Sequence, residues 1–270
     1  MRKIPTPKRF WGFIKSKRCD NTGVAPLKHQ TSGITYSDNK AKANILNEQF
    51  SSVFNKNEDK DNITKKGESP HPSMAEIKIH ESGIFKLLNG LNIHKATGPD
   101  GIPTQVLKEL AHELTPVMSL FFQASVNQGS IPDEWKEANV VPIFKKGDKS
   151  KAVNYRPVSL TVVLCKVMKH IICSNVMKHL DRNNILTDAQ HGFRKRRSCE
   201  SQLILTIKDL ASSIDLKEQI DLILLDFSKA FDKVPHARLL YKMEYYGIRG
   251  HMNSWNRDFL ENRQQQVVLE

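Results

Sequence analysis

Hydrophobic residues recur at helical spacing along most of the chain, and this pattern predicts a protein rich in helices. One helix begins at a cap formed by Ser37 or Asp38. A loop is expected at 92–103, followed by a helical pair that is broken near Pro116. Gly247 suits the left-handed residue that follows the last helix. The predicted helices cover residues 38–54, 84–91, 104–128, 159–180, 198–214 and 236–246.

Three short apolar runs predict strands instead, at 139–144, 220–225 and 264–269. The second run is predicted to be a strand buried on both faces. The helix at 198–214, which leads into it, is expected to point its apolar residues inward. Asp226 then places a carboxylate where the sheet meets solvent. Such an aspartate is typical of a metal-binding strand end or, on structural grounds alone, of a residue that caps the next turn.

The charge balance is strongly basic. There are 41 Lys and Arg against 29 Asp and Glu, a formal net charge of +12. This excess favours a polyanionic partner such as nucleic acid, with acidic membrane lipid as the competing partner. No apolar run is long enough for a membrane span, and the basic N-terminus has no apolar stretch typical of a signal peptide. The sequence therefore predicts an intracellular protein, in the nucleus or the cytoplasm, and no membrane.

The cysteines and histidines give no pattern of a metal site. The four cysteines are widely spaced and form no CxxC pair, so reduced thiols are expected. His112-Glu113 is followed by Pro116 where a zinc-binding HExxH motif needs its second histidine. Neither disulfides nor zinc is therefore indicated.

Two segments depart from the apolar periodicity. Residues 1–20 carry seven basic side chains and one acidic one, which suits either a phosphate-contacting arm or a solvated terminus. Residues 55–73 contain one apolar side chain and many charges, so burial cannot offset the entropy lost on ordering. This second segment is predicted to be a disordered linker.

Basic residues also gather in two loops near the apolar elements. The first runs from Lys145 to Pro157 and the second from Gln190 to Arg197. Arginine offers a planar fork for phosphate oxygens, and lysine acts as a mobile point charge. Both loops are therefore candidate phosphate sites, with an ordinary solvated loop as the alternative.

The order of these segments resembles the reverse transcriptases of non-LTR (LINE-type) retrotransposons, especially the jockey-like branch. Residues 95–103 look like the extra fingers motif of that group, and residues 226–232 look like motif A of the palm. The similar stretches read KATGPDGIP, VPIFKKGD with NYRPVSL, QHGFR with RS, and DFSKAFD. Residues 11–14 and 50–54 are similar to the stretch that links endonuclease and polymerase in these elements, so the likeness covers nearly the whole chain.

The resemblance implies an α+β fold, a right-hand polymerase with an incomplete palm and a helical N-terminal extension. A basic arm and helix at 1–54 and the linker at 55–73 would precede the fingers at 74–214. The remaining residues, 215–270, would form part of the palm.

It also implies RNA-directed DNA synthesis, with an RNA template, a DNA primer and dNTPs as partners. Two Mg²⁺ ions would align the primer hydroxyl with the α-phosphate, and carboxylates suit these ions because Mg²⁺ prefers oxygen ligands. Asp226 would be the catalytic residue and ligate both ions, with the Phe227 carbonyl assisting one.

The resemblance further implies the residues that hold nucleotide and nucleic acid. Phe231 matches the steric gate that excludes a ribose 2′ hydroxyl. Without the resemblance, an aromatic residue of the core is an equally good interpretation of Phe231. Which lysine of the first loop holds the triphosphate stays open. The nucleotide-binding candidates are Lys145, Lys146, Arg156 and Phe231, and the nucleic-acid-binding candidates are Lys95, Arg194, Lys195, Arg196 and Arg197.

One departure from the family pattern argues against polymerase activity in this chain by itself. The palm needs a second carboxylate pair, normally in a Tyr-x-Asp-Asp turn, and the sequence contains no Asp-Asp pair. The chain is therefore expected to be a truncated reverse transcriptase that does not polymerise DNA by itself. Two alternatives are a non-catalytic nucleic-acid-binding module and a decayed fragment without a stable fold.

Overall fold

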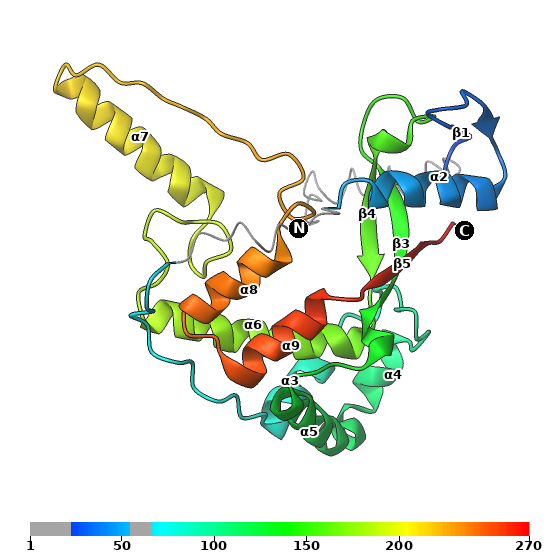
Figure 1. The fold of residues 1–270 in the computed structure, drawn as a ribbon, viewed down its shortest axis with the longest axis horizontal. Coiled ribbons are helices and arrows are strands. Elements are labelled where there is room, and N and C mark those ends of the chain that lie inside the picture. The colour runs from blue at the N-terminus through cyan, green and yellow to red at the C-terminus, as the bar shows by residue number, and fades with distance from the viewer. Residues whose placement is uncertain (1–22, 55–65, 270) are drawn as a thin grey trace, which may run out of the picture. The chain divides into compact units, whose positions relative to one another are not determined.

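The structure is a computed structural model that describes residues 23–54 and 66–269 (Figure 1). The basic arm predicted at 1–20 lies outside the described residues, as does most of the predicted linker. The described chain forms two compact units. The first comprises the described residues of Met1–Ser52, Ala138–Leu160 and Gln265–Glu270, and the second those of Val53–Glu137 and Thr161–Gln264. The limits predicted for the domains stay a prediction.

The first unit combines one helix with two small sheets. Its three-stranded sheet has the strand order β4-β3-β5, and β1 pairs antiparallel with β2. Asp38, one of the two predicted caps, accepts a hydrogen bond from the Ala41 N–H at 2.9 Å and starts the helix. The elements are β1 (Leu27–Lys28), β2 (Thr35–Tyr36), α2 (Asn39–Ser51), β3 (Glu137–Phe144), a 3₁₀ turn (Ala152–Asn154), β4 (Tyr155–Leu160) and β5 (Gln264–Val267). Their core contains Leu27, Ile45, Leu46, Phe50, Val140, Ala152 and Tyr155.

The second unit is helical. In it α5 packs against α3 and α9, and α8 packs against α9. Trp135, Trp255 and Phe122 are among the buried side chains of its core. The elements are α3 (Glu81–Asn89), α4 (Thr104–Glu109), α5 (Ala111–Gln128), a 3₁₀ turn (Asp133–Lys136), α6 (Val163–Arg182), α7 (Cys199–Asp215), α8 (His236–Tyr245) and α9 (Gly250–Leu260). The mixture of helix and sheet confirms the α+β class.

A partly buried ion pair holds α9 against the turn before β3. The Lys136 ammonium lies 2.8 Å from an Asp258 carboxylate oxygen, and the other oxygen accepts a hydrogen bond from the Ile131 N–H at 2.7 Å. Partial burial opposes ionisation of Asp258, but these hydrogen bonds prevail and hold its pKa below the usual value. The hydrogen bond to Asp258 and a second one to Asp133 raise the pKa of Lys136. The pair therefore stays charged across the neutral range.

The break predicted near Pro116 is wrong. Pro116 lies inside α5, and the break falls at Leu110, between α4 and α5. A proline costs a helix one backbone hydrogen bond. Here the buried apolar face that α5 presents with Phe122 and Val126 keeps the helix continuous.

The strand predicted over 220–225 does not form either. These residues have no strand assignment, and Leu222 to Leu225 are exposed, Leu224 to 84%. A strand buried on both faces needs hydrogen-bonded neighbours and a packed layer on each side, and no described strand pairs with this run.

α7 forms where it was predicted, with Ser198 as its cap, but the prediction that its apolar residues point inward is wrong. No residue of α7 is buried, so Leu203, Ile207 and Ile214 are exposed. Figure 1 shows the extended course of the chain between α7 and α8. We call residues 199–235, which include α7 and this extended segment, the apolar arm.

Within the described residues Cys165, Cys173 and Cys199 are free thiols, and burial raises the pKa of Cys165. No described helix has the length and apolar character required to cross a membrane.

Candidate nucleotide and nucleic-acid sites

The first candidate site is the β3–β4 hairpin of the first unit. The antiparallel register places Ile143 opposite Arg156 and Phe144 opposite Tyr155. Tyr155 is buried and its ring contacts Phe144, whereas Ile143 and Arg156 are exposed. Because successive side chains of a strand point to opposite faces, the hairpin has one face on the core and one face with Arg156 toward solvent.

Lys145 shares the solvent face with Arg156. Its N–H donates to the Asn154 carbonyl at 2.9 Å, which continues the pairing one residue beyond β3. It therefore lies two residues beyond Ile143 on the same face, diagonal to Arg156. Lys146 follows in the turn. None of these three cations has an ion-pair or hydrogen-bond partner for its side chain in the described part of the chain, and all three are exposed.

The loop that joins β3 to β4 is held together by its own hydrogen bonds. The Ser150 N–H and hydroxyl both donate to an Asp148 carboxylate oxygen, at 2.9 and 2.8 Å. These two bonds, the backbone one first, hold the pKa of Asp148 below its usual value. The Asn154 side-chain amide donates to the Asp148 carbonyl at 2.8 Å. The hairpin is thus ordered independently of Lys145 and Arg156, whose charges remain available.

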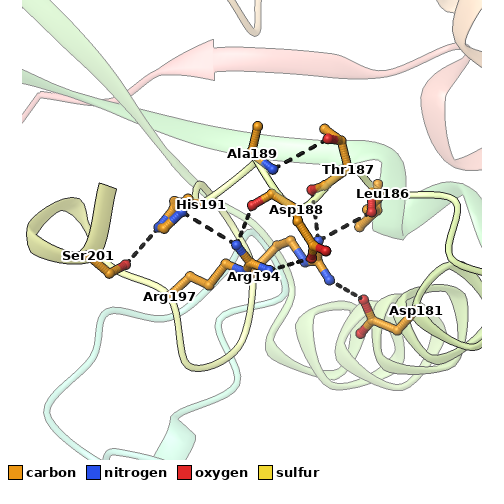
Figure 2. Close-up of polar contacts among 9 residues, drawn as sticks. All are labelled: Asp181, Leu186, Thr187, Asp188, Ala189, His191, Arg194, Arg197 and Ser201. Atoms are coloured by element: carbon orange, nitrogen blue, oxygen red, sulfur yellow. Dashed lines mark hydrogen bonds and ion pairs between the residues drawn. The ribbon is translucent and has the colours of Figure 1, made fainter. Parts of the chain in front are cut away.

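The second candidate site is the loop before α7, shown in Figure 2. Arg194 points back into its own unit. Its guanidinium donates to the Thr187 carbonyl at 3.0 Å and lies 3.3 Å from an Asp181 carboxylate oxygen, with its side chain only 16% exposed. Arg194 therefore holds the loop to the end of α6.

Arg197 is also engaged within the loop. It donates to the backbone carbonyl and, at 2.6 Å, to the carboxylate of Asp188, and it reaches His191 Nε2 at 3.4 Å. His191 is buried, and its Nδ1 lies 2.7 Å from the Ser201 hydroxyl. Since Ser201 Oγ donates to the Ser198 carbonyl at 2.9 Å, His191 Nδ1–H is the donor and Nε2 accepts from Arg197. This chain of bonds ties the loop to the first turn of α7.

The remaining residues of the loop point outward. Phe193 and Arg196 both have a φ of +60°, in the left-handed region, so the backbone reverses direction twice over four residues. Phe193 is 86% exposed, and Lys195 and Arg196 are exposed without an ion pair among described residues. Of the four predicted nucleic-acid contacts in this loop, two carry free charge and two are internally paired.

Sequence reasoning missed the residues that pair with these arginines. Asp181 and Asp188 lie 13 and 9 positions before their partners, separations that belong to no helix or strand period. The buried polar role of His191 likewise left no signal in the sequence. Lys95, the remaining nucleic-acid candidate, is exposed in the loop before α4.

Asp226, Phe227 and Phe231 all lie on the apolar arm of the second unit. The Asp226 carboxylate is exposed and has no hydrogen-bond or ion-pair partner among the described residues. Phe231 is 77% exposed and contacts the Phe193 ring edge-on, with ring centroids 6.0 Å apart. The arm thus brings the predicted steric-gate ring to the loop that carries Lys195 and Arg196.

The described residues contain no group of three or more His, Cys, Asp or Glu side chains that could hold a metal ion. Asp226 offers one carboxylate and Phe227 one carbonyl, both oxygen donors of the kind that Mg²⁺ prefers. These two groups fit part of a magnesium site.

The C-terminal part of the chain matches a known protein family. Residues 143–269 match the family described as reverse transcriptase (RNA-dependent DNA polymerase). This range includes Ile143 and Phe144 at the end of β3, the turn and β4 that follow, the loop before α7 and the apolar arm. Within that class, the chain is related to the reverse transcriptases of non-LTR retrotransposons, and the predicted resemblance is confirmed.

Three relatives, all from Drosophila melanogaster, support this relationship. The probable RNA-directed DNA polymerase from transposon BS is 29% identical over 189 residues, 67% of this chain and 21% of the relative. The RNA-directed DNA polymerase from mobile element jockey is 25% identical over 242 residues, 86% of this chain and 26% of the relative. The probable RNA-directed DNA polymerase from transposon X-element is 29% identical over 182 residues, which are 65% of this chain and 19% of the relative. The chain thus spans about a fifth to a quarter of the length of these relatives.

Proposed function

We propose that residues 74–269 supply the fingers and part of the palm of an RNA-directed DNA polymerase, which extends a DNA primer on an RNA template. The observation that carries this proposal is the β3–β4 hairpin, which presents Lys145 and Arg156 as unpaired cations on one exposed face. The match of residues 143–269 to the reverse transcriptase family supports it, as does the net charge of +12.

In this proposal Lys145 and Arg156 hold the triphosphate of the incoming nucleotide. The guanidinium of Arg156 forms paired hydrogen bonds with phosphate oxygens, and the Lys145 ammonium adds a point charge beside it. As pyrophosphate leaves, these cations stabilise its developing negative charge. Phe231 is proposed to lie beneath the sugar and to exclude a 2′ hydroxyl.

Asp226 and the Phe227 carbonyl are proposed as ligands for Mg²⁺. When bound, a pair of such ions polarises the phosphate and stabilises the attacking and leaving oxygens. The exposed, unpartnered carboxylate of Asp226 supports this role, because such a group is available for a cation without breaking an internal bond.

Photo-crosslinking of a nucleotide tests the hairpin. Purified 1–270 is irradiated with radiolabelled 8-azido-dATP and Mg²⁺, and the concentration for half-maximal labelling is measured. We expect Lys145→Ala and Arg156→Ala each to raise that concentration about tenfold or more, because each removes a charged hydrogen bond. Lys146→Ala is expected to have a smaller effect, since Lys146 lies in the turn.

Lys151→Ala is the matched control, because it removes an exposed lysine of the same loop. Its labelling should equal that of the parent. Labelling that is absent, or that is insensitive to Lys145 and Arg156, contradicts the proposal. If RNA binding persists in that case, the chain acts as a non-catalytic nucleic-acid-binding module.

Primer extension by residues 1–270 gives a separate prediction. The polypeptide contains Asp226 but no Asp-Asp pair, so it lacks the Tyr-x-Asp-Asp carboxylates of the two-ion mechanism. With an RNA template, a DNA primer and Mg²⁺ or Mn²⁺, we expect no dNTP incorporation above a no-enzyme blank. Robust incorporation would overturn this expectation while supporting the family activity.

A further inference from the structure

One side of α7 forms a continuous apolar line, which we call the α7 seam. Its residues follow one another at spacings of four, three and four positions, so their side chains lie one above the other along the helix. This is the spacing by which helices pack in a coiled coil. The seam consists of Leu203, Ile207, Leu210 and Ile214. Leu210 is half-buried, and the other three residues are 59–65% exposed.

The charged side chains of the middle and end of α7 lie away from the seam. Lys208, Asp209 and Asp215 each follow or precede a seam residue directly, and successive side chains of a helix point about 100° apart. The hydroxyl of Ser201, through which α7 is bonded to the loop before it, lies two positions before the first seam residue and so on the opposite side. The contact that holds α7 to its own unit therefore leaves the seam uncovered.

The apolar arm is the acidic part of a basic chain. Residues 199–235 contain seven Asp and Glu against four Lys, whereas the whole chain has a net charge of +12. A polyanion is thus a poor partner for this part of the molecule. A row of exposed aliphatic side chains without charge among them fits another apolar protein surface.

We propose that the α7 seam binds the same seam of a second copy of this chain, with the two helices antiparallel. A twofold axis through the middle of the seam places Ile207 against the partner's Leu210, and Leu203 against the partner's Ile214. Each layer of the contact then joins one leucine to one isoleucine, so the seam is complementary to itself. This proposal goes beyond the polymerase function and does not depend on Lys145 or Arg156.

The charges at the two ends of α7 favour the antiparallel order. Glu200 lies in the first turn of α7, and Lys217 follows the end of the helix. The antiparallel pair brings Glu200 near the partner's Lys217 and sets the two helix dipoles in opposite directions. A parallel pair would instead set Glu200 beside the partner's Glu200.

The area of the seam predicts a reversible dimer. The seam residues, with Ile204 and the small side chains beside them, offer roughly 500 Å² of surface per copy. The total of about 1,000 Å² is at the low end of specific interfaces, which typically bury about 1,600 Å². We therefore expect a dissociation constant on the order of 10 µM.

Sedimentation equilibrium of purified 1–270 between about 1 and 200 µM tests the dimer. The weight-average mass should rise from 30.8 kDa toward twice that value. Ile207→Glu puts a charge at the centre of the seam, against the partner's apolar Leu210. We expect this variant to bind itself about 100-fold or more weakly, because the buried carboxylate has no counter-charge. Ile207 is exposed within its own chain, so circular dichroism should show an unchanged helix content.

Leu205→Glu is the matched control. Leu205 is 44% exposed on the same helix but lies two positions from Ile207, on the side opposite the seam. It should dimerise like the parent. A parent that stays monomeric up to 200 µM would overturn the proposal, and so would an equal loss of association in both variants, which indicates non-specific contact between apolar surfaces. A monomeric parent whose RNA binding is weakened by Ile207→Glu would assign the seam to nucleic acid instead.

Mild oxidation tests the order of the two helices. Cys199 is an exposed free thiol in the first turn of α7. In the antiparallel dimer the two copies of Cys199 lie at opposite ends of the pair, more than about 20 Å apart. Mass spectrometry should therefore find no disulfide between Cys199 and the partner's Cys199. Such a disulfide, formed in the parent and lost in Ile207→Glu, would contradict the antiparallel arrangement.

Discussion

Gly247→Ala is expected to lower the free energy of unfolding of the second unit by about 3 kcal/mol or more. Gly247 has a φ of +91°, which strains a residue with a Cβ. Its added carbon would overlap the carbonyl oxygen of Pro72 and lie 2.8 Å from His179 Nε2. Neither neighbour is free to move, because His179 bonds the Tyr246 carbonyl at 2.7 Å and the segment after Pro72 bonds Gly247 itself through Met74.

Urea unfolding followed by tryptophan fluorescence measures this effect. Trp135 and Trp255 both lie in the core of the second unit and report its unfolding. Gly83→Ala is the matched control: Gly83 lies in the first turn of α3, and nothing lies within 4 Å of its added Cβ. That control should be neutral or stabilise by about 0.5 kcal/mol, because alanine favours a helix. Equal stability of the two variants would contradict the geometry given for Gly247.

The sequence predicted local structure well where the apolar face has a partner. The periodicity of α6 and α8, the Asp38 cap, the start of α7 near Ser198 and the left-handed Gly247 are all confirmed. α9 was missed, although Met252, Trp255 and Phe259 have helical spacing and pack in the core of the second unit. The helix begins at Gly250, directly after Arg249, and a glycine at this position predicts a turn and not the start of a helix.

The apolar arm shows why periodicity alone was insufficient. A repeating apolar pattern predicts that side chains share one face, but it does not say that another element covers that face. α7 has such a face, and the run before Asp226 has strand-like composition, yet both are exposed in the described structure. Burial depends on contacts distant in sequence, which a single pattern does not contain.

The candidate sites divide in a similar way. Sequence identified the basic loops but could not tell paired cations from free ones. Arg194 and Arg197 are held by carboxylates, whereas Lys195 and Arg196 point outward because the backbone reverses at Phe193. In the hairpin, the register, and not the sequence, puts Lys145 and Arg156 on one face.

Limited proteolysis is expected to cut the apolar arm far faster than the helical core. Lys217 and Lys229 are exposed, have φ values of +58° and +54°, and flank a stretch without backbone pairing. Cleavage there needs no unfolding, whereas cleavage within α5 or α6 requires their packed helices to open. Within the described residues, the first tryptic cuts should fall after Lys217 and Lys229, at a rate about 100-fold or more above cuts in α6.

Mass spectrometry of the earliest fragments identifies the cut sites. The double variant Lys217→Gln/Lys229→Gln removes both susceptible bonds and should slow cleavage in the arm, while cuts elsewhere keep their rates. If residues 220–225 instead formed a paired and buried strand, the bonds beside it would resist trypsin as long as α6 does. Early cuts in the helical core with an intact arm would therefore refute the exposed course of the arm.

The arm carries Asp226 and Phe231, so its accessibility also decides whether the proposed magnesium ligand and steric gate are preorganised in this polypeptide. Rapid cleavage would mean that these residues acquire their working geometry only when the arm packs against further structure.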